Sequence, residues 1–83
     1  MRYNYYVALL NDNDNSLEYI TRIDNSTKMF FCEKGKPALK FSKTHADDML
    51  YCLVVNNRNA VVIKTPNFYT LSNKEAVDES SSN

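Results

Sequence analysis

Glycine, proline, tryptophan and histidine are all scarce in this chain. Its 83 residues include one Gly, two Pro, one His and no Trp. With a single glycine, a glycine-rich phosphate loop can hardly be built, and collagen-like or linker-like architectures are excluded. One histidine and two cysteines without a Cys-x-x-Cys pair do not make a zinc ligand set. We therefore expect no cofactor and no metal site.

Neither sign of charge is in excess, and no hydrophobic run is long. Ten basic and ten acidic residues give a formal net charge of zero. Nucleic-acid-binding proteins usually carry a basic surplus that neutralises phosphates, so nucleic acid is the less favoured partner. No stretch approaches the roughly 20 apolar residues of a membrane span, so no membrane partner is expected. A cytoplasmic protein is predicted, with Cys32 and Cys52 as reduced thiols.

The composition that remains is typical of a small folded domain. Hydrophobic residues make up 43% of the chain and aromatic residues 12%, as in globular proteins. A chain of this length buries only about 60% of the surface that its unfolded form exposes, so a small core is expected. The sequence predicts a single α+β domain over residues 1–71. Residues 72–83 are predicted to form a short helical turn or a mobile acidic and serine-rich tail.

Apolar runs separated by polar clusters predict the strands. Residues 3–10 and 17–23 flank the turn-forming segment "NDNDNS" and predict an antiparallel hairpin. Residues 28–33 predict a third strand of the same meander, followed by a turn at "KGKP" on the single glycine. Residues 60–65 are a continuous apolar run that predicts a strand inside the sheet, ended by Pro66. The segment "NFYTL" can add a last edge strand.

A helical pattern begins after Pro37. Four apolar residues recur at the spacing of one helical face: Ala46, Met49, Leu50 and Leu53. Thr44 is expected to cap this helix with Asp47 in a capping-box position, and Ser42 is the less favoured cap. The polar residues 56–59 end it. The fold class is thus predicted as α+β, a small, mainly antiparallel sheet of four to five strands with one helix packed on one face. The predicted order is strand, strand, strand, helix, strand.

The segment "FSKTHADDML" combines residue types found in acid–base sites. His45 and Asp48 lie three residues apart, so they can meet on a helix, and a cysteine with His45 could form a nucleophile–base pair. However, Ser and Asp are common at helix starts because they satisfy free amide groups, and no nucleophile motif surrounds Cys32 or Cys52. We interpret the segment as a helix start. The protein is predicted not to be an enzyme, with no catalytic residue.

A basic turn is the first candidate for partner binding. Four lysines occur between residues 34 and 43 with no acid among them: Lys34, Lys36, Lys40 and Lys43. Beside the aromatic residues Phe30, Phe31 and Phe41, they could contact phosphates or an acidic protein surface. The alternative is a solvated turn whose lysines protect a sheet edge from unwanted pairing.

Tyrosines on the predicted sheet are the second candidate. The candidate set comprises Tyr3, Tyr5, Tyr6, Tyr19 and Tyr51, and the first four of these are the predicted partner-binding residues. One helix covers one face of a small sheet, so tyrosines on the other face would be exposed, and tyrosine is enriched at interfaces. The alternative is that some of them fill the core in place of tryptophan. If they are exposed, a homodimer through the open face or the edge strands is the first expectation.

The stretch "CEKGKPALKFSKTHADDMLYCL" resembles small uncharacterised accessory proteins of bacteriophages and prophages of low-GC Gram-positive bacteria. In those proteins a strand, a Lys-Gly turn and a Phe-Ser-x cap precede an amphipathic helix. The resemblance covers about a quarter of the chain. It implies a small α+β protein that acts by binding, as a host-takeover or anti-defence factor, and it implies no catalytic residue.

The predicted function is a non-enzymatic protein-interaction module with an unidentified protein partner. The missing catalytic constellation and the many tyrosines favour this interpretation. The alternative is a weak nucleic-acid-binding protein that uses the basic turn at residues 34–43.

Overall fold

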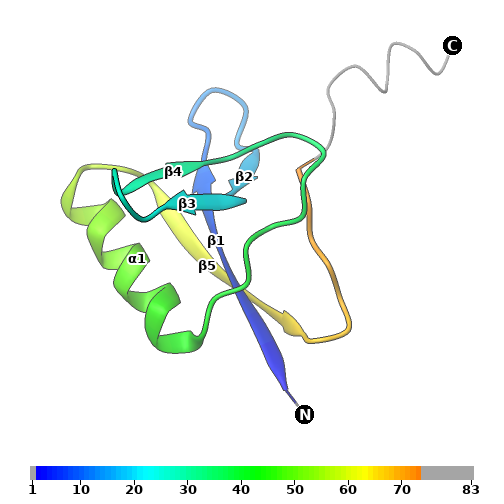
Figure 1. Cartoon of the computed structure of the whole chain (residues 1–83). Helices are drawn as coiled ribbons and strands as arrows, with labels where there is room; N and C mark the ends of the chain where they lie inside the picture. Colours follow the sequence, from blue (N-terminus) through cyan, green and yellow to red (C-terminus); the bar gives the residue numbers. More distant parts are fainter. Residues whose placement is uncertain (1, 74–83) are drawn as a thin grey trace, which may run out of the picture.

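In the computed structural model, residues 2–73 are described, and they form one helix and five strands (Figure 1). The elements follow the order β1 (Tyr3–Leu10), β2 (Leu17–Tyr19), β3 (Arg22–Asp24), β4 (Met29–Phe31), α1 (Lys43–Val55) and β5 (Ala60–Pro66). The predicted α+β class is confirmed, and the order differs only in that the second expected strand is divided in two. The predicted helical turn or tail lies outside the described residues from position 74 onward.

Strand β1 is the centre of a three-stranded antiparallel sheet, with β2 on one side and β5 on the other. Its pairing with β5 runs without interruption from Tyr3 opposite Pro66 to Leu9 opposite Ala60. Four consecutive residues of β1, positions 6–9, are buried. Burial on both faces is typical of a central strand, and it explains the continuous apolar run in this part of the sequence.

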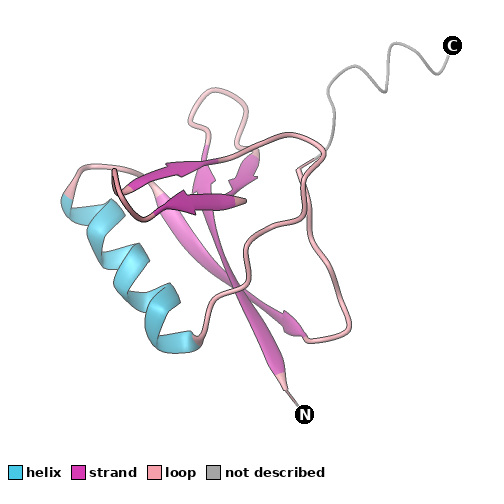
Figure 2. Cartoon of the chain, in the orientation of Figure 1, coloured by secondary structure: helices cyan, strands magenta, loops and turns pink. Residues whose placement is uncertain are grey.

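The expected strand 17–23 bends in its middle and serves two sheets (Figure 2). Before the bend, the backbone N–H of Ile20 donates to the carbonyl of Val7 at 2.9 Å. After the bend, the N–H of Thr21 donates to the carbonyl of Phe31 at 2.8 Å, and β3 pairs with β4 in a separate hairpin. The expected three-stranded meander is therefore wrong in one respect, because the chain changes pairing partner at Ile20, whose side chain is completely buried.

Two turns are built on the same three residue types, Asp-Asn-Ser. The Asp14 Oδ1 accepts from the backbone N–H and the hydroxyl of Ser16 at 3.0 and 2.7 Å. The Asp24 Oδ1 accepts from the backbone N–H and the hydroxyl of Ser26 at 2.9 and 2.7 Å. These hydrogen bonds lower the pKa of both carboxyl groups. Such side-chain bonds to the local backbone are what favour Asp in turns.

Helix α1 is capped by Ser42, whose hydroxyl accepts from the backbone N–H of His45 at 3.2 Å. The expected cap at Thr44, with Asp47 in the capping box, is wrong. The backbone N–H of Phe41 donates to the carbonyl of Tyr5 at 2.8 Å, so the chain stays extended up to Phe41 and the helix begins directly afterwards. Asp47 instead forms an ion pair with Lys43, one turn earlier, at 3.0 Å.

The core lies between α1 and the sheet. It is formed by Val7, Leu9, Ile20, Ala46 and Leu53, which come from β1, the bend and the helix. The helix packs against β1 and β5, so one face of the sheet is covered as predicted. Ala46 and Leu53 are the buried residues of the helical stripe identified in the sequence.

The second face of the sheet is covered as well, by the segment 67–73, which runs beside the connection from β4 to α1 (Figure 1). Tyr6 and Ala8 on β1 have no exposed surface. The Tyr6 hydroxyl donates to the carbonyl of Tyr69 at 3.0 Å, and its ring meets the ring of Tyr19 edge-to-face. The expectation that this face is open is therefore wrong, because an irregular segment, and no second helix, covers it.

That covering segment replaces the expected last edge strand. After a turn at Pro66, it forms isolated bridges with the connection between β4 and α1. These bridges join Ser72 with Pro37 and Asn73 with Lys34. A local apolar pattern cannot distinguish such irregular pairing from a short strand.

Candidate functional site

A groove of about 1000 Å³ lies between α1 and the β3–β4 hairpin. Its apolar lining consists of buried or half-buried residues: Ile23, Phe30, Leu39, Phe41, Met49 and Leu53. The hairpin, the extended segment before the helix and α1 each contribute two of these side chains. All of them except the buried Leu53 stay partly exposed, because strands β3 and β4 stand apart from the helix. Concave surfaces lined by apolar and aromatic side chains are the usual form of binding sites.

The rim of this groove carries more positive than negative charge. Lys28, Lys40 and Arg58 are exposed at the rim, against the single carboxylate of Asp48. The Arg58 guanidinium carbon lies 5.4 Å from the centroid of the Phe30 ring, so this cation is held over the aromatic lining. The groove therefore offers an apolar surface together with a positive field, which suits an acidic ligand with apolar groups.

The groove also brings together the residues considered for catalysis, His45, Asp48 and Cys52. His45 and Cys52 are both exposed, and within residues 2–73 no hydrogen bond joins any two of these three side chains. A nucleophile and its base need such a contact, and the base needs an orienting partner. The described residues also contain no group of three His, Cys, Asp or Glu side chains that could hold a metal ion.

Cys32 lies outside the groove, in a different environment. Its thiol is half-buried and donates to the backbone carbonyl of Glu18 at 3.8 Å. Burial and the nearby Glu18 carboxylate raise the pKa of this thiol. A raised pKa keeps the sulfur protonated and unreactive at neutral pH, so Cys32 is suited to packing.

The structure does not gather the four lysines of the basic turn into one patch. All four are exposed, but Lys40 lines the groove, whereas Lys34 lines a separate hollow beside Asn73. Lys43 is paired with Asp47. Among the neighbouring rings, those of Phe30 and Phe41 line the groove, and the Phe31 ring is faced by the Arg22 guanidinium, whose carbon lies 3.9 Å from the ring centroid.

The tyrosines are divided between the core and the surface. Tyr6 is completely buried and Tyr19 half-buried against it, so Tyr6 is not available to a partner. Tyr5 packs on the core, and Tyr3 is 42% exposed with the ammonium of Lys64 lying 4.1 Å from its ring centroid. The alternative that some tyrosines fill the core therefore holds for Tyr6.

Comparison with known proteins gave no match to a protein-family model, to a curated protein or to a solved structure. No helix within residues 2–73 has the length and apolar character needed to cross a membrane. Function is therefore inferred from the groove and from the other exposed surfaces of the domain.

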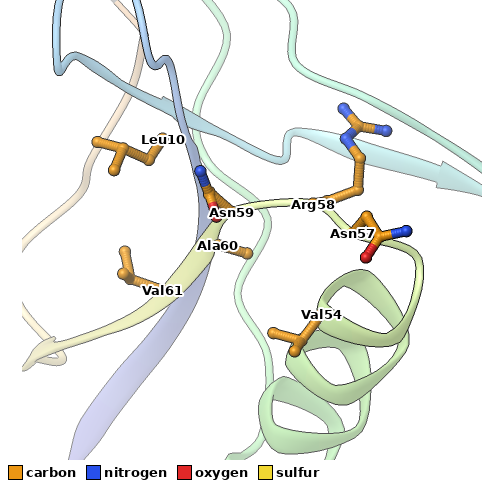
Figure 3. Close-up of a pocket in the computed structure, with 7 residues that line it drawn as sticks. All are labelled: Leu10, Val54, Asn57, Arg58, Asn59, Ala60 and Val61. Atoms are coloured by element: carbon orange, nitrogen blue, oxygen red, sulfur yellow. The ribbon is translucent and has the colours of Figure 1, made fainter.

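The sequence interpretation missed the groove and, apart from Tyr51, one further surface, an apolar area beside the start of β5. Tyr51, Val54 and Val55 on α1 are 70%, 54% and 56% exposed, and Val61 on β5 is 38% exposed. The signal was present, because Tyr51, Val54 and Val55 follow the i, i+3, i+4 spacing of a second helical stripe. A hollow of about 450 Å³ opens between Val54 and Val61 (Figure 3).

Proposed function

We propose that this protein is a non-enzymatic protein-interaction module whose groove between α1 and the β3–β4 hairpin binds an acidic segment with apolar side chains from a partner protein. The observation that carries the proposal is the combination of an apolar lining with a rim of Lys28, Lys40 and Arg58 against Asp48 alone. An apolar lining supplies affinity, and complementary charge supplies orientation and rate of encounter.

The dimensions of the groove favour a peptide segment over a small molecule. Its volume of about 1000 Å³ is at the upper end of small-molecule sites, which enclose most of the ligand. The groove runs between a helix and a hairpin, and such grooves accept an amphipathic helix or an extended segment through a few apolar anchors. Phe30 and Met49, one from each wall, are placed to contact such anchors.

The absence of an activated nucleophile supports the non-enzymatic part of the proposal. His45 has neither an orienting partner nor a hydrogen bond to Cys52 among the described residues, and the raised pKa of Cys32 disfavours its thiolate. The resemblance of the stretch that begins at Cys32 to phage and prophage proteins supports a cytoplasmic host-takeover or anti-defence role. Homodimer formation is compatible with this role, because the apolar area beside β5 is separate from the groove.

The alternative function is weak binding of nucleic acid through Lys34, Lys36, Lys40 and Lys43. It is supported by the exposure of all four side chains. It is less favoured because Lys43 is already paired with Asp47 and the four lysines do not lie in one patch. Nucleic-acid binding of this kind would weaken steeply as salt is raised.

The test is to capture partners from a bacterial lysate after nuclease treatment and to titrate the purified partner by calorimetry. Replacing both Lys40 and Arg58 by Glu should raise Kd at least tenfold, which corresponds to about 1.4 kcal/mol. Met49→Glu should abolish binding. Lys36→Glu is the matched control, because Lys36 is exposed and does not line the groove.

Equal loss of affinity in the Lys36→Glu control would contradict the groove as the binding site. Loss of the captured material on nuclease treatment, together with loss on replacing the four lysines by Gln, would favour the nucleic-acid alternative. Unfolding midpoints of each variant should be measured first. The replaced cations are exposed, so these midpoints should stay close to that of the wild type.

A further inference from the structure

The outer edge of β5 is unpaired among the described residues. The N–H of Leu10 donates to the carbonyl of Asn59 at 2.9 Å, which continues the register of β1 with β5. In an antiparallel ladder, hydrogen-bonded pairs alternate with non-hydrogen-bonded pairs. The backbone groups of Val61 and Ile63 therefore point to β1, and those of Ala60, Val62 and Lys64 point outward. Within residues 2–73, β5 pairs with β1 and with no other strand.

Pro66 is consistent with this assignment of inward and outward groups. It stands opposite Tyr3 in the register, which is a non-hydrogen-bonded position. Its missing N–H is therefore on the outward side, where proline is tolerated at sheet edges. The free edge that can accept another strand thus extends over residues 60–64.

We propose that the free edge of β5 pairs antiparallel with β5 of a second copy of this chain, across a two-fold axis at Val62. In this register Ala60 lies opposite Lys64 of the second copy, and Val62 lies opposite Val62. The outward N–H and C=O groups of all three residues then find partners on both strands. A shift by one residue would place outward groups opposite inward ones, and a shift by two would leave some groups unpaired. An unpaired edge of this kind is a template for another strand.

Charge complementarity favours a second copy as the occupant. The single charge of β5, Lys64, is at one end of the free edge. At the other end, the Asp12 carboxylate is held by the side chain of Asn59 at 2.8 Å. Antiparallel pairing brings Lys64 of each copy toward the Asp12 end of the other and keeps the two lysines apart. Arg58, a cation at the same end, also lines the hollow beside the edge, and its guanidinium carbon lies 5.4 Å from the centroid of the Phe30 ring.

The hollow beside this edge, which has a mixed apolar and polar lining, would be filled by the same contact. Figure 3 shows Val54 from α1 and Val61 from β5 on opposite sides of the start of the strand, and both line the hollow there. Both residues are exposed in the single chain, at 54% and 38%. A strand of the second copy at this edge would cover them. Neither residue lines the groove, so this inference goes beyond the proposed partner binding and does not depend on it.

The first test compares two variants of Lys64 by sedimentation velocity over a range of concentrations. Lys64→Pro removes an outward N–H but no bond to β1, because the N–H of Lys64 is not used in that pairing. Lys64→Ala removes the same side chain and keeps the N–H. We expect the wild type and Lys64→Ala to form dimers and Lys64→Pro to raise the dimer Kd at least tenfold. A wild type that stays monomeric, or a Lys64→Pro dimer as tight as that of Lys64→Ala, would overturn the proposal.

The second test fixes the register and remains informative if Lys64→Pro fails to fold. In a background with Cys32 and Cys52 replaced by Ser, single cysteines are placed at positions 61, 62 and 63 and oxidised. Hydrogen-bonded antiparallel pairs have Cα atoms about 5.5 Å apart, within the range that a disulfide spans. Val62→Cys should cross-link with itself. Val61→Cys and Ile63→Cys should cross-link only when the two variants are mixed, because each opposes the other. Efficient self-cross-linking at 61 or 63, or none at 62, would refute this register.

Discussion

The side-chain amide of Asn73 pairs with the backbone of Tyr19 as a neighbouring strand would. Its Oδ1 accepts from the Tyr19 N–H at 2.9 Å, and its Nδ2 donates to the Tyr19 carbonyl at 2.9 Å. The same Nδ2 is 3.3 Å from the carbonyl of Glu33, and the Asn73 carbonyl accepts from the N–H of Gly35 at 2.7 Å. One residue therefore closes the outer edge of β2 and ties the last described segment to the connection that follows β4.

Replacing this amide should destabilise the fold measurably. Asn73→Ala leaves the partly buried backbone groups of Tyr19 without their side-chain partner, so we expect the free energy of unfolding to fall by about 1–3 kcal/mol. Urea denaturation followed by circular dichroism measures this change. Ser72→Ala is the control, because Ser72 is exposed and its side chain makes no hydrogen bond within the described residues. An effect of Asn73→Ala no larger than that of Ser72→Ala would refute the bridging role.

The helix cap gives a prediction that separates two neighbouring residues. The Ser42 hydroxyl accepts from the N–H of His45, so Ser42→Ala should lower the free energy of unfolding by about 1 kcal/mol. Thr44→Ala should change it little, because Thr44 is an exposed residue inside the first turn. Thermal and urea unfolding of the two variants side by side is sufficient. The reverse order of effects would mean that the helix begins at Thr44.

The pKa of Asp24 is lowered, mainly by the hydroxyl and then by the backbone N–H of Ser26. A carboxyl group with a lower pKa in the folded state stabilises the fold above its unfolded pKa of about 4. This stabilisation is lost as the pH falls through the folded value. Asp24→Asn should therefore be less stable than the wild type at pH 7, and the difference should shrink below pH 4. Urea midpoints at several pH values test this, and Ser26→Ala should reproduce the trend. A difference that does not depend on pH would contradict the prediction.

The two cysteines should differ in reactivity. Cys52 is exposed, whereas Cys32 is half-buried with a raised pKa. At neutral pH we expect iodoacetamide to modify Cys52 first and Cys32 only slowly, because the thiolate is the reacting form. Peptide mass spectrometry over time distinguishes the two sites, and in urea both should react at similar rates. Preferential labelling of Cys32 in the folded protein would show that its thiol is activated.

The elements with strong local patterns could be predicted from the sequence. Three elements are predicted by patterns within their own residues. They are the strand 3–10, the helix with its apolar stripe through Ala46 and Leu53, and the strand that ends at Pro66. The turns at Asp14 and Asp24 could be placed for the same reason. In each case the residues that decide the local structure are neighbours in the chain.

What could not be predicted depends on contacts between distant residues. The apolar–polar alternation of residues 17–23 continues through the bend at Ile20. It therefore gives no sign that residues 17–19 pair with β1 and residues 22–24 with β4. The cover over Tyr6 comes from Tyr69, and the start of the helix is fixed by the bond between Phe41 and Tyr5. The groove needs the hairpin and the helix side by side, so Lys40, Phe30 and Phe41 could be named from the sequence but not the site that they form together.

The pairing of β1 with β5 has a consequence for the synthesis of this protein. The chain emerges from the ribosome with its N-terminus first, so β1 leaves before any of its partners. The hairpin of β3 and β4 needs only neighbouring residues and can form early. Strand β5, which pairs with β1 along almost its whole length, ends only at Pro66. Asn67 and Tyr69, which accept hydrogen bonds from Asn4 and Tyr6, are synthesised later still. The central strand of the sheet therefore waits, with one edge open, until translation of the domain is nearly complete.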